Sequence, residues 1–226
     1  MLYYKSATSG PIMRIAILGT GDVGSRLGSK LVVMGNEVRM GSRTAKNAKG
    51  AAWAKAAGAK ASAGTFAEAA KFGEVVFNCT LGAVSLEALK QADANNLAGK
   101  VLVDVANPLD FSKGMPPTLT VCNTDSLGEQ IQRAFPDAKV VKTLNTMGNV
   151  VMVNPGLVPG NHDVFLCGND GLAKAKVVEI LHGFGWKSPI DLGDITAARG
   201  MEMLVPIWLR LYGKFQSPNF NFKIAR

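Results

Sequence analysis

The chain has 226 residues, of which 47% are hydrophobic and 19% charged, a composition typical of a globular protein that buries a core. Its 25 Lys and Arg outnumber its 17 Asp and Glu, but these basic residues are dispersed and only 7% of residues are aromatic, so we expect a small polyanion rather than a nucleic acid as partner. No apolar run approaches the length of about 20 residues that a membrane helix needs, so we expect a soluble protein without membrane association.

The N-terminal residues and the cysteines narrow the class of protein further. Residues 1–12 lack the order of a secretory signal, and we expect them to form a disordered extension. Cys79, Cys122 and Cys167 are widely separated, and the chain has only 2 His, so neither a disulfide framework nor a metal site is predicted. Three unpaired thiols are typical of a reducing compartment, which indicates a cytoplasmic protein.

Short β-branched runs alternate with helical patterns from Met13 to about residue 145. This alternation predicts right-handed βαβ crossovers, and therefore an α/β fold with a doubly wound parallel sheet, the Rossmann NAD(P)-binding arrangement, in a dinucleotide-binding domain over residues 13–145. The expected strands span residues 14–18, 37–40, 74–79, 100–106 and 139–144, and the expected helices span residues 21–34, 45–57, 85–91 and 125–135.

The pattern changes in the last third of the chain, where Gly, Pro and Asn dominate up to residue 160. We expect residues 146–226 to form a small C-terminal α+β domain that completes a substrate slot. Its expected elements are a strand at 163–168, a helix at 171–182, an apolar helix at 196–212 kinked by Pro206, and a final strand at 219–226. The apolar stretch 201–211 is compatible with a homodimer.

The first expected strand leads into a glycine-rich loop, Gly19-Thr20-Gly21-Asp22-Val23-Gly24. In a βαβ unit, this spacing lets Gly19 make a tight turn, Gly21 admit a pyrophosphate and Gly24 bring helix and strand together. The free N–H groups at the start of the following helix favour an anion. The loop therefore predicts a bound dinucleotide.

The second expected strand ends in Gly41-Ser42-Arg43, where proteins specific for NAD usually carry an acidic residue. A guanidinium binds phosphate in a bidentate fashion, and a hydroxyl can donate to a phosphate oxygen. Lys46 adds positive charge nearby. Ser42, Arg43 and Lys46 therefore predict NADP(H) as the cofactor. The hydroxyl of Thr44 can also donate to a phosphate oxygen, or Thr44 can be the N-cap of a helix beginning at residue 45.

Several segments together resemble the coenzyme F420-dependent NADP oxidoreductases, to which the cytoplasmic domain of membrane ferric reductases is related. The glycine loop and the segment GNEVRMGSR are similar to the nucleotide loop and the 2′-phosphate clamp of that family, with the clamp formed by Thr20, Ser42 and Arg43. DVANPL at 104–109 resembles its Asn-Pro loop, VVKTLNT at 140–146 its sixth-strand segment, and LGDITAARGMEMLVPIWLRL at 192–211 its C-terminal helix.

This resemblance implies that a hydride passes directly between the nicotinamide and a redox co-substrate such as coenzyme F420 or a flavin. The cofactors carry such chemistry, so no catalytic side chain is expected, which agrees with the lack of an evident catalytic triad or carboxylate pair. We expect the slot at the carboxyl ends of three strands, lined by Thr80, Leu81, Gly82, Ala106, Asn107, Pro108, Asn145 and Met147. Leu81 and Met147 can equally be core residues.

The sequence leaves open both the identity of the electron acceptor and the class of reaction. A quinone-like compound or a ferric chelate could replace the deazaflavin or flavin. A second hypothesis is a non-catalytic sensor that binds NADPH to control association with a protein. A third, a dehydrogenase of small hydroxy acids, would need a Lys with an Asn or His in the cleft, and Lys174 and Lys176 lie in a helix that we expect to face solvent.

Overall fold

The structure is a computed structural model that describes residues 12–225. The disordered extension expected at residues 1–12 therefore lies, apart from Ile12, outside the described residues. The strands are β1 (Arg14–Leu18), β2 (Glu37–Ser42), β3 (Ala61–Thr65), β4 (Val75–Asn78), β5 (Val101–Asp104), β6 (Leu109–Asp110), β7 (Thr118–Leu119), β8 (Lys139–Thr143), β9 (Phe165–Gly168) and β10 (Ile190–Asp191).

Helices fill the connections between these strands. The α-helices are α1 (Asp22–Val33), α2 (Ala48–Ala57), α3 (Phe66–Phe72), α4 (Gly82–Ala92), α5 (Ala94–Leu97), α6 (Leu127–Ala134), α7 (Asn149–Val153), α8 (Gly171–Phe184), α9 (Ala198–Met203) and α10 (Val205–Phe215). Two short 3-10 helices, η1 (Pro155–Leu157) and η2 (Ile195–Ala197), precede β9 and α9.

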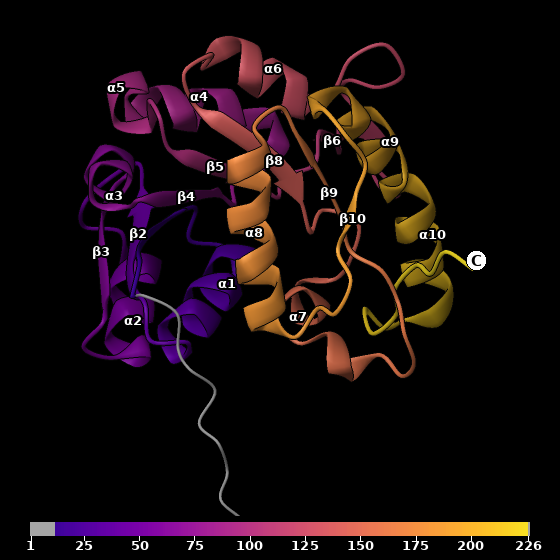
Figure 1. The fold of residues 1–226 in the computed structure, drawn as a ribbon, viewed down its shortest axis with the longest axis horizontal. Helices are drawn as coiled ribbons and strands as arrows, with labels where there is room; N and C mark the ends of the chain where they lie inside the picture. The colour runs from indigo at the N-terminus through magenta and orange to yellow at the C-terminus, as the bar shows by residue number, and fades with distance from the viewer. Residues whose placement is uncertain (1–11, 226) are drawn as a thin grey trace, which may run out of the picture.

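Eight of the strands form one sheet in the order β10-β9-β8-β5-β4-β1-β2-β3 (Figure 1). Neighbouring strands from β8 to β3 are parallel, whereas β9 is antiparallel to β8 and β10 runs parallel to β9. The chain proceeds outward from β1 to β3 and then returns to β4 on the other side of β1. In open α/β sheets, such a reversal of strand order marks the place where ligands bind, here outside the carboxyl ends of β1 and β4.

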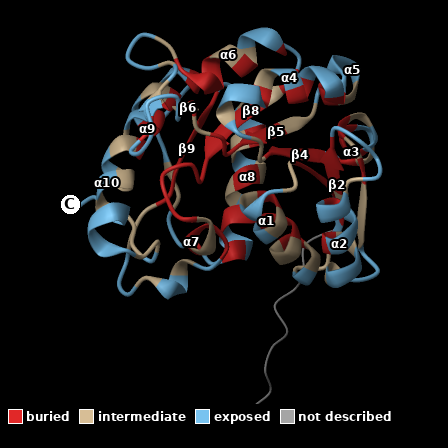
Figure 2. Cartoon of the chain, turned by 180° about the vertical axis from the view of Figure 1, so that it is seen from behind, coloured by how far each residue is buried: buried red, intermediate tan, exposed pale blue. Residues whose placement is uncertain are grey.

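Two layers of helices cover the sheet because alternate side chains of each strand face opposite sides. Leu27 and Leu31 of α1 pack with α2, α7 and α8 on one face. Ile131 of α6 packs with α3, α4, α5 and α9 on the other face. Figure 2 shows the buried strands between helices whose outer surfaces are exposed. The predicted α/β class with a mostly parallel, doubly wound sheet is confirmed.

The C-terminal region is built differently from the expectation. β9 and β10 extend the main sheet beyond β8. The helix expected at 196–212 is divided at Leu204 into α9 and α10, because Pro206 lies in the first turn of α10 and has no N–H for a continuous helix. The strand expected at 219–226 is absent over its described residues, 219–225.

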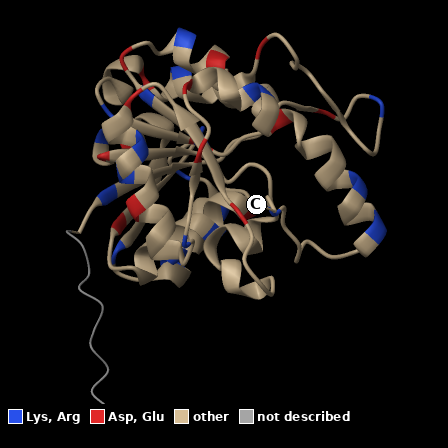
Figure 3. Ribbon diagram, turned by 45° about the vertical axis from the view of Figure 1, so that its right-hand side comes forward, with Lys and Arg blue, Asp and Glu red and all other residues tan. Residues whose placement is uncertain are grey.

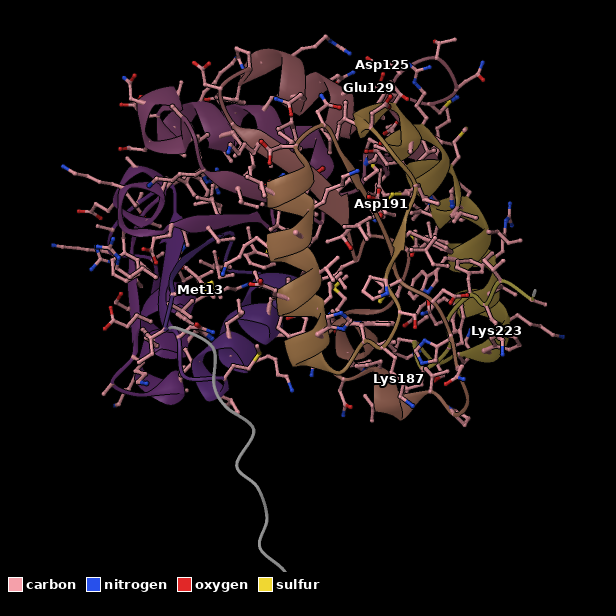
Figure 4. The ribbon with its side chains drawn as sticks, in the orientation of Figure 1. Met13, Asp125, Glu129, Lys187, Asp191 and Lys223 are labelled. Carbon is pink, nitrogen blue, oxygen red and sulfur yellow. The ribbon has the colours of Figure 1, made fainter. Side chains whose placement is uncertain are left out.

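The α9 helix is attached to α6 by buried polar contacts. Arg199 of α9 donates from Nε to Oε2 of Glu129 on α6 over 2.8 Å, and Glu129 is labelled at this junction in Figure 4. Glu202 of α9 accepts the backbone N–H groups of Leu127 and Gly128 over 2.9 and 3.1 Å. These contacts fix the start of the C-terminal helices against the sheet layer.

Charged residues are distributed over the described part of the chain. Lys and Arg are scattered among Asp and Glu on many elements (Figure 3). Between residues 12 and 225, none of the helices combines the length and the apolar character that crossing a membrane would require.

Candidate functional site

The glycine loop between β1 and α1 has the backbone geometry that the sequence predicted. Gly19 has a φ of +120°, and a Cβ there would lie 2.6 Å from the carbonyl oxygen of Cys79. A Cβ at Gly24 would overlap the carbonyl oxygen of Gly19. Gly21, in contrast, has open space around it and is the N-cap of α1 without a side-chain capping bond. The N-terminus of α1 is therefore open to an anionic group.

The end of β2 lies beside this loop, because the N–H of Gly19 donates to the carbonyl of Gly41 over 3.0 Å. Ser42 is buried, and its Oγ donates to the carbonyl of Thr44 over 2.6 Å. Arg43 and Lys46 are exposed, and neither takes part in the ion pairs formed within residues 12–225. Both cations are thus available to a ligand beside the loop.

The alternative role of Thr44 as an N-cap is wrong. The helix after β2 begins at Ala48, and its N-cap is Asn47, whose side chain accepts the N–H of Gly50 over 2.9 Å. Lys46 therefore lies in the turn before α2 rather than in the helix. Residues 43–46 form a bend and a turn, so Thr44 and Lys46 do not lie at the start of the helix as the sequence suggested.

One cavity of about 310 Å³ opens beside the ends of β4, β5 and β8. It contains every residue expected in the slot except Pro108, which is buried and does not line it. The lining residues are Val23, Cys79, Thr80, Leu81, Gly82, Ala83, Val105, Ala106, Asn107, Leu109, Phe111, Asn145, Met147, Gly148, Asn149, Met152 and Trp208. Leu81 is 73% exposed and Met147 is 5% exposed, so Leu81 is not a core residue, whereas Met147 contributes to both core and cavity.

The loops after β4 and β5, which form two walls of the cavity, pack closely against each other through their backbones. A Cβ at Gly82 would overlap the carbonyl oxygen of Asn107. Glycine at this first position of α4 therefore permits the loop after β5 to lie directly against the loop after β4. A larger residue would displace both loops.

A chain of hydrogen bonds supports the wall after β4. The fully buried Asn78 donates from Nδ2 to Asp104 over 2.8 Å and to Ser85 over 3.1 Å. Its Oδ1 accepts the hydroxyl of Thr80 over 2.7 Å. The side chain of Thr80 is therefore held in place by groups behind the cavity surface.

The walls after β5 and β8 are joined by a reciprocal pair of amides. Asn107 donates from Nδ2 to the backbone carbonyl of Asn145 over 2.8 Å, and Asn145 donates from Nδ2 to Oδ1 of Asn107 over 3.0 Å. Asn145 Nδ2 also donates to the carbonyl of Met201 over 3.1 Å. With Nδ2 fixed by this carbonyl, Oδ1 of Asn145 is left buried and without a partner among the described residues.

The sequence did not predict the buried charges behind these walls. Lys142 is fully buried, and its Nζ donates to Asp104 over 2.7 Å, to Glu202 over 2.8 Å and to the carbonyl of Ala106 over 2.6 Å. Burial by itself lowers the pKa of an ammonium, but the two carboxylates hold the pKa of Lys142 above its usual value. Lys142 thus connects β5, β8 and α9 through ion pairs, and its hydrogen bond to the Ala106 carbonyl fixes that group beside the cavity.

Phe111 and Trp208 are aromatic lining residues that the sequence did not indicate. Phe111 follows β6, and Trp208 lies in α10, far along the chain from the strand ends. Trp208 belongs to the apolar stretch 201–211, which gave a signal for burial or association but none for a cavity wall.

Comparison with known proteins adds family information to this geometry. A family model described as NADP oxidoreductase, coenzyme F420-dependent, matches residues 14–108. An F420-dependent NADP reductase from Methanocaldococcus jannaschii is 31% identical over 222 residues, covering 94% of this chain and 98% of that protein. Metalloreductase STEAP3 from Rattus norvegicus is 31% identical over 199 residues, covering 86% of this chain but 38% of that protein.

Solved structures agree with the sequence relatives. A crystal structure from Arthrobacter sp. FB24, assigned to the F420-dependent NADP reductases, is 54% identical and has a TM-score of 0.90 over 95% of this chain and 100% of that chain. A reductive aminase from Aspergillus terreus, in complex with NADPH4, cyclohexanone and allyl amine, has a TM-score of 0.63 at 18% identity, over 91% of this chain and 63% of that chain. At that identity the second likeness concerns the fold alone.

Proposed function

Because this chain belongs to the family of F420-dependent NADP oxidoreductases, we propose that it transfers a hydride between NADP(H) and a redox co-substrate, coenzyme F420 or a flavin. The observation that carries this proposal is the cavity at the ends of β4, β5 and β8, which adjoins the glycine loop through Val23. A dinucleotide that crosses the reversal of strand order would extend from that loop into the cavity.

The adenosine half of the cofactor is assigned to the glycine loop and the end of β2. The pyrophosphate would lie at residues 19–24, against the open N-terminus of α1. The 2′-phosphate would contact Thr20, Ser42, Arg43 and Lys46. The exposed guanidinium of Arg43 supports this assignment, while the hydroxyl of Ser42 would have to turn from the carbonyl of Thr44 to donate to the phosphate.

The nicotinamide half is assigned to the cavity. Asn145 fits it, because its buried Oδ1 has no partner among the described residues and can accept an N–H of the nicotinamide carboxamide. The walls formed by Thr80, Gly82, Ala106 and Asn107 would hold the ring in position. When bound, the nicotinamide supplies the hydride chemistry itself, and the chain contributes orientation and exclusion of water.

The similarity to STEAP3 favours ferric reduction as a second candidate activity, since that metalloreductase matches 86% of this chain. A non-catalytic NADPH sensor is the outcome that would remain if no electron acceptor supports turnover. Lys174 does not support a hydroxy-acid dehydrogenase, because it pairs with Asp191 over 2.8 Å and does not line the cavity.

Two further proposals concern the state of the protein in the cell. The free thiols of Cys79, Cys122 and Cys167 support a cytoplasmic location, and burial raises the pKa of Cys167 to about 12, which keeps it unreactive. The exposed apolar residues Met203, Ile207 and Phe215 support a homodimer formed through α9 and α10.

The test is to mix the purified protein with NADPH and, separately, with coenzyme F420, FMN or ferric citrate. We expect the nicotinamide absorbance to fall with F420 or FMN, and the reduced co-substrate to accumulate in equal amount. Turnover with ferric citrate alone would favour the metalloreductase alternative. Tight NADPH binding without loss of absorbance in any mixture would favour the sensor and contradict an enzyme.

A further inference from the structure

Trp208 is placed in the cavity by an aromatic stack that involves the C-terminal segment, residues 217–225. Its ring stacks on Tyr212 with centroids 5.5 Å apart and on Phe220 with centroids 5.3 Å apart. Phe215 contacts Phe220 edge to face, with centroids 5.4 Å apart. The indole is therefore held between a residue of its own helix and a residue of the segment that follows it.

The C-terminal segment is itself fixed to the loop before β9. The N–H of Asp163 donates to the carbonyl of Phe222 over 3.0 Å, and the N–H of Ile224 donates to Oδ2 of Asp163 over 2.6 Å. Lys223 of this segment lines one surface pocket together with Asp163 and Lys187 (Figure 4 labels the two lysines). These bonds hold the segment without a sheet ladder.

The same segment reaches the cavity wall at Gly148. A Cβ there would lie 2.9 Å from Pro218 and 3.5 Å from the Trp208 ring. Gly148 and Trp208 both line the cavity. The aromatic stack and the close contact at Gly148 together fix the position of the indole. A group that contacts a ligand is expected to be pre-organised in this way.

The indole N–H of Trp208 is buried and has no hydrogen-bond acceptor among the described residues. The other two tryptophans pair theirs, Trp53 with Ser29 over 3.0 Å and Trp186 with the carbonyl of Met152 over 3.0 Å. An unpaired buried donor destabilises the ligand-free protein. Such groups in native proteins call for an explanation such as a ligand or a bound water.

We propose that Trp208 determines specificity for the redox co-substrate, by donating its indole N–H to a carbonyl oxygen on a planar conjugated ring in the cavity. This inference rests on the proposed function and assigns the co-substrate to the class of deazaflavins and flavins, whose rings carry such carbonyls. The unpaired Oδ1 of Asn145, after β8, takes the nicotinamide, and the unpaired donor of Trp208, from α10, takes the second ring. The cavity then offers one polar contact to each of the two rings that exchange the hydride.

The test compares Trp208→Phe with the unmodified protein in direct binding of oxidised F420 and of FMN, measured by calorimetry. Phe keeps an aromatic ring in the stack and removes the N–H donor together with part of the indole surface. Loss of one hydrogen bond is expected to weaken co-substrate binding by roughly 3- to 10-fold. The affinity for NADPH should change by less than about 2-fold, because the nicotinamide is assigned to Asn145 and the adenosine half to the glycine loop, not to Trp208.

Thermal unfolding of the ligand-free variant supplies a readout that a structural role would move. Both Trp208→Phe and Trp53→Phe lose packing surface, but only Trp53→Phe also loses a hydrogen bond, so Trp208→Phe should lower the Tm by less while it weakens co-substrate binding. The matched control is Trp53→Phe, which removes an N–H that is paired with Ser29 and lies outside the cavity. That control should leave co-substrate binding unchanged.

Three results would overturn the inference. The first is unchanged co-substrate affinity in Trp208→Phe, which would indicate a bound water as the acceptor. The second is weakened NADPH binding with intact co-substrate binding, which would assign the N–H to the nicotinamide carboxamide. The third is a lack of F420 and FMN binding in the unmodified protein. Binding of F420 or FMN without hydride transfer would instead contradict the proposed function and leave the inference standing.

Discussion

We propose that Arg43 is the residue on which the choice between NADP(H) and NAD(H) depends. It follows β2 at the place where an acidic residue would bind the 2′-hydroxyl of NAD, and its guanidinium is exposed and free of the ion pairs formed within residues 12–225. A positive side chain here attracts a 2′-phosphate, whereas an acidic one would repel it.

We predict that Arg43→Ala weakens NADPH binding by roughly 10- to 100-fold, because hydrogen bonds between charged groups contribute about 1.5–3 kcal/mol. NADH binding should hardly change, because NADH has no 2′-phosphate. Calorimetric titration of both cofactors at one fixed ionic strength measures this preference. Lys49→Ala is the control, since it removes an equal charge from the exposed first turn of α2. An unaltered preference for NADPH in Arg43→Ala would show that the phosphate lies elsewhere.

The sequence predicted which residues form this site, but it did not predict the hydrogen bonds that their side chains make or lack. The glycine spacing and the Ser-Arg pair identify the loop and the end of β2 because both depend on local geometry. The bond from Ser42 to the carbonyl of Thr44 and the unpaired atoms of Asn145 and Trp208 depend on contacts between distant segments. No local pattern contains that information.

Lys142 connects the strands below the cavity to the C-terminal helices. It joins Asp104 of β5 and Glu202 of α9, and Glu202 in turn accepts two N–H groups at the start of α6. An ammonium at this position offsets one of the two negative charges on carboxylates that have almost no access to solvent. Its removal leaves them buried and uncompensated.

We predict that Lys142→Met destabilises the protein by about 3–5 kcal/mol, the effect of removing one partner from a buried ion pair. Lys139→Met is the matched control on the same strand. Lys139 pairs with Asp170 over 3.3 Å at the surface, where such pairs contribute at most about 1 kcal/mol. Urea unfolding of both variants gives the comparison. Equal losses of stability in the two variants would contradict a structural role for the buried charges.

The sequence predicted the central strands of the sheet better than the edge strand β3, helix α3 and the C-terminal segment. β1, β4, β5 and β8 are rich in β-branched residues and were expected within two residues of their bounds. β3 and α3 were missed, because the segment ASAGTFAEAAKF has no strand alternation and β3 is stabilised by its pairing with β2. The final segment alternates like a strand, yet its backbone bonds go to Asp163, so no ladder forms.

The slot was predictable to the extent that it follows strand order. Thr80, Ala106 and Asn145 each come directly after a parallel strand, and the carboxyl ends of such strands meet at one edge of the sheet. Phe111 and Trp208 reach the same cavity from a loop and from α10. Their positions depend on how the C-terminal segment packs, which no strand rule describes.

One sheet contains strands from both halves of the chain. β9 and β10 come after residue 145 and continue the sheet beyond β8. We therefore propose that residues 13–145 and 146–226 differ in role although they share one sheet. Residues 13–145 hold the dinucleotide. Residues 146–226 close the cavity with Trp208 and carry the exposed apolar face of α10.

That apolar face leads to a prediction about assembly. Ile207 is 52% exposed and Phe215 is 55% exposed on α10, next to the exposed Met203 of α9. A row of apolar side chains on consecutive helices is stabilised by pairing with the same row of a second copy about a two-fold axis. We predict a homodimer, with a sedimentation mass twice the 23.8 kDa of the chain.

Ile207→Glu tests the interface, because it places a charge in the centre of the proposed contact, where desolvation is unfavourable. We expect this variant to sediment as a monomer at concentrations where the unmodified protein is a dimer. Leu172→Glu is the matched control, since Leu172 is 80% exposed at the start of α8 and lies outside α9 and α10. That control should remain dimeric. A monomeric unmodified protein, or equal dissociation of both variants, would contradict a dimer built on α10 and leave its apolar face to another partner.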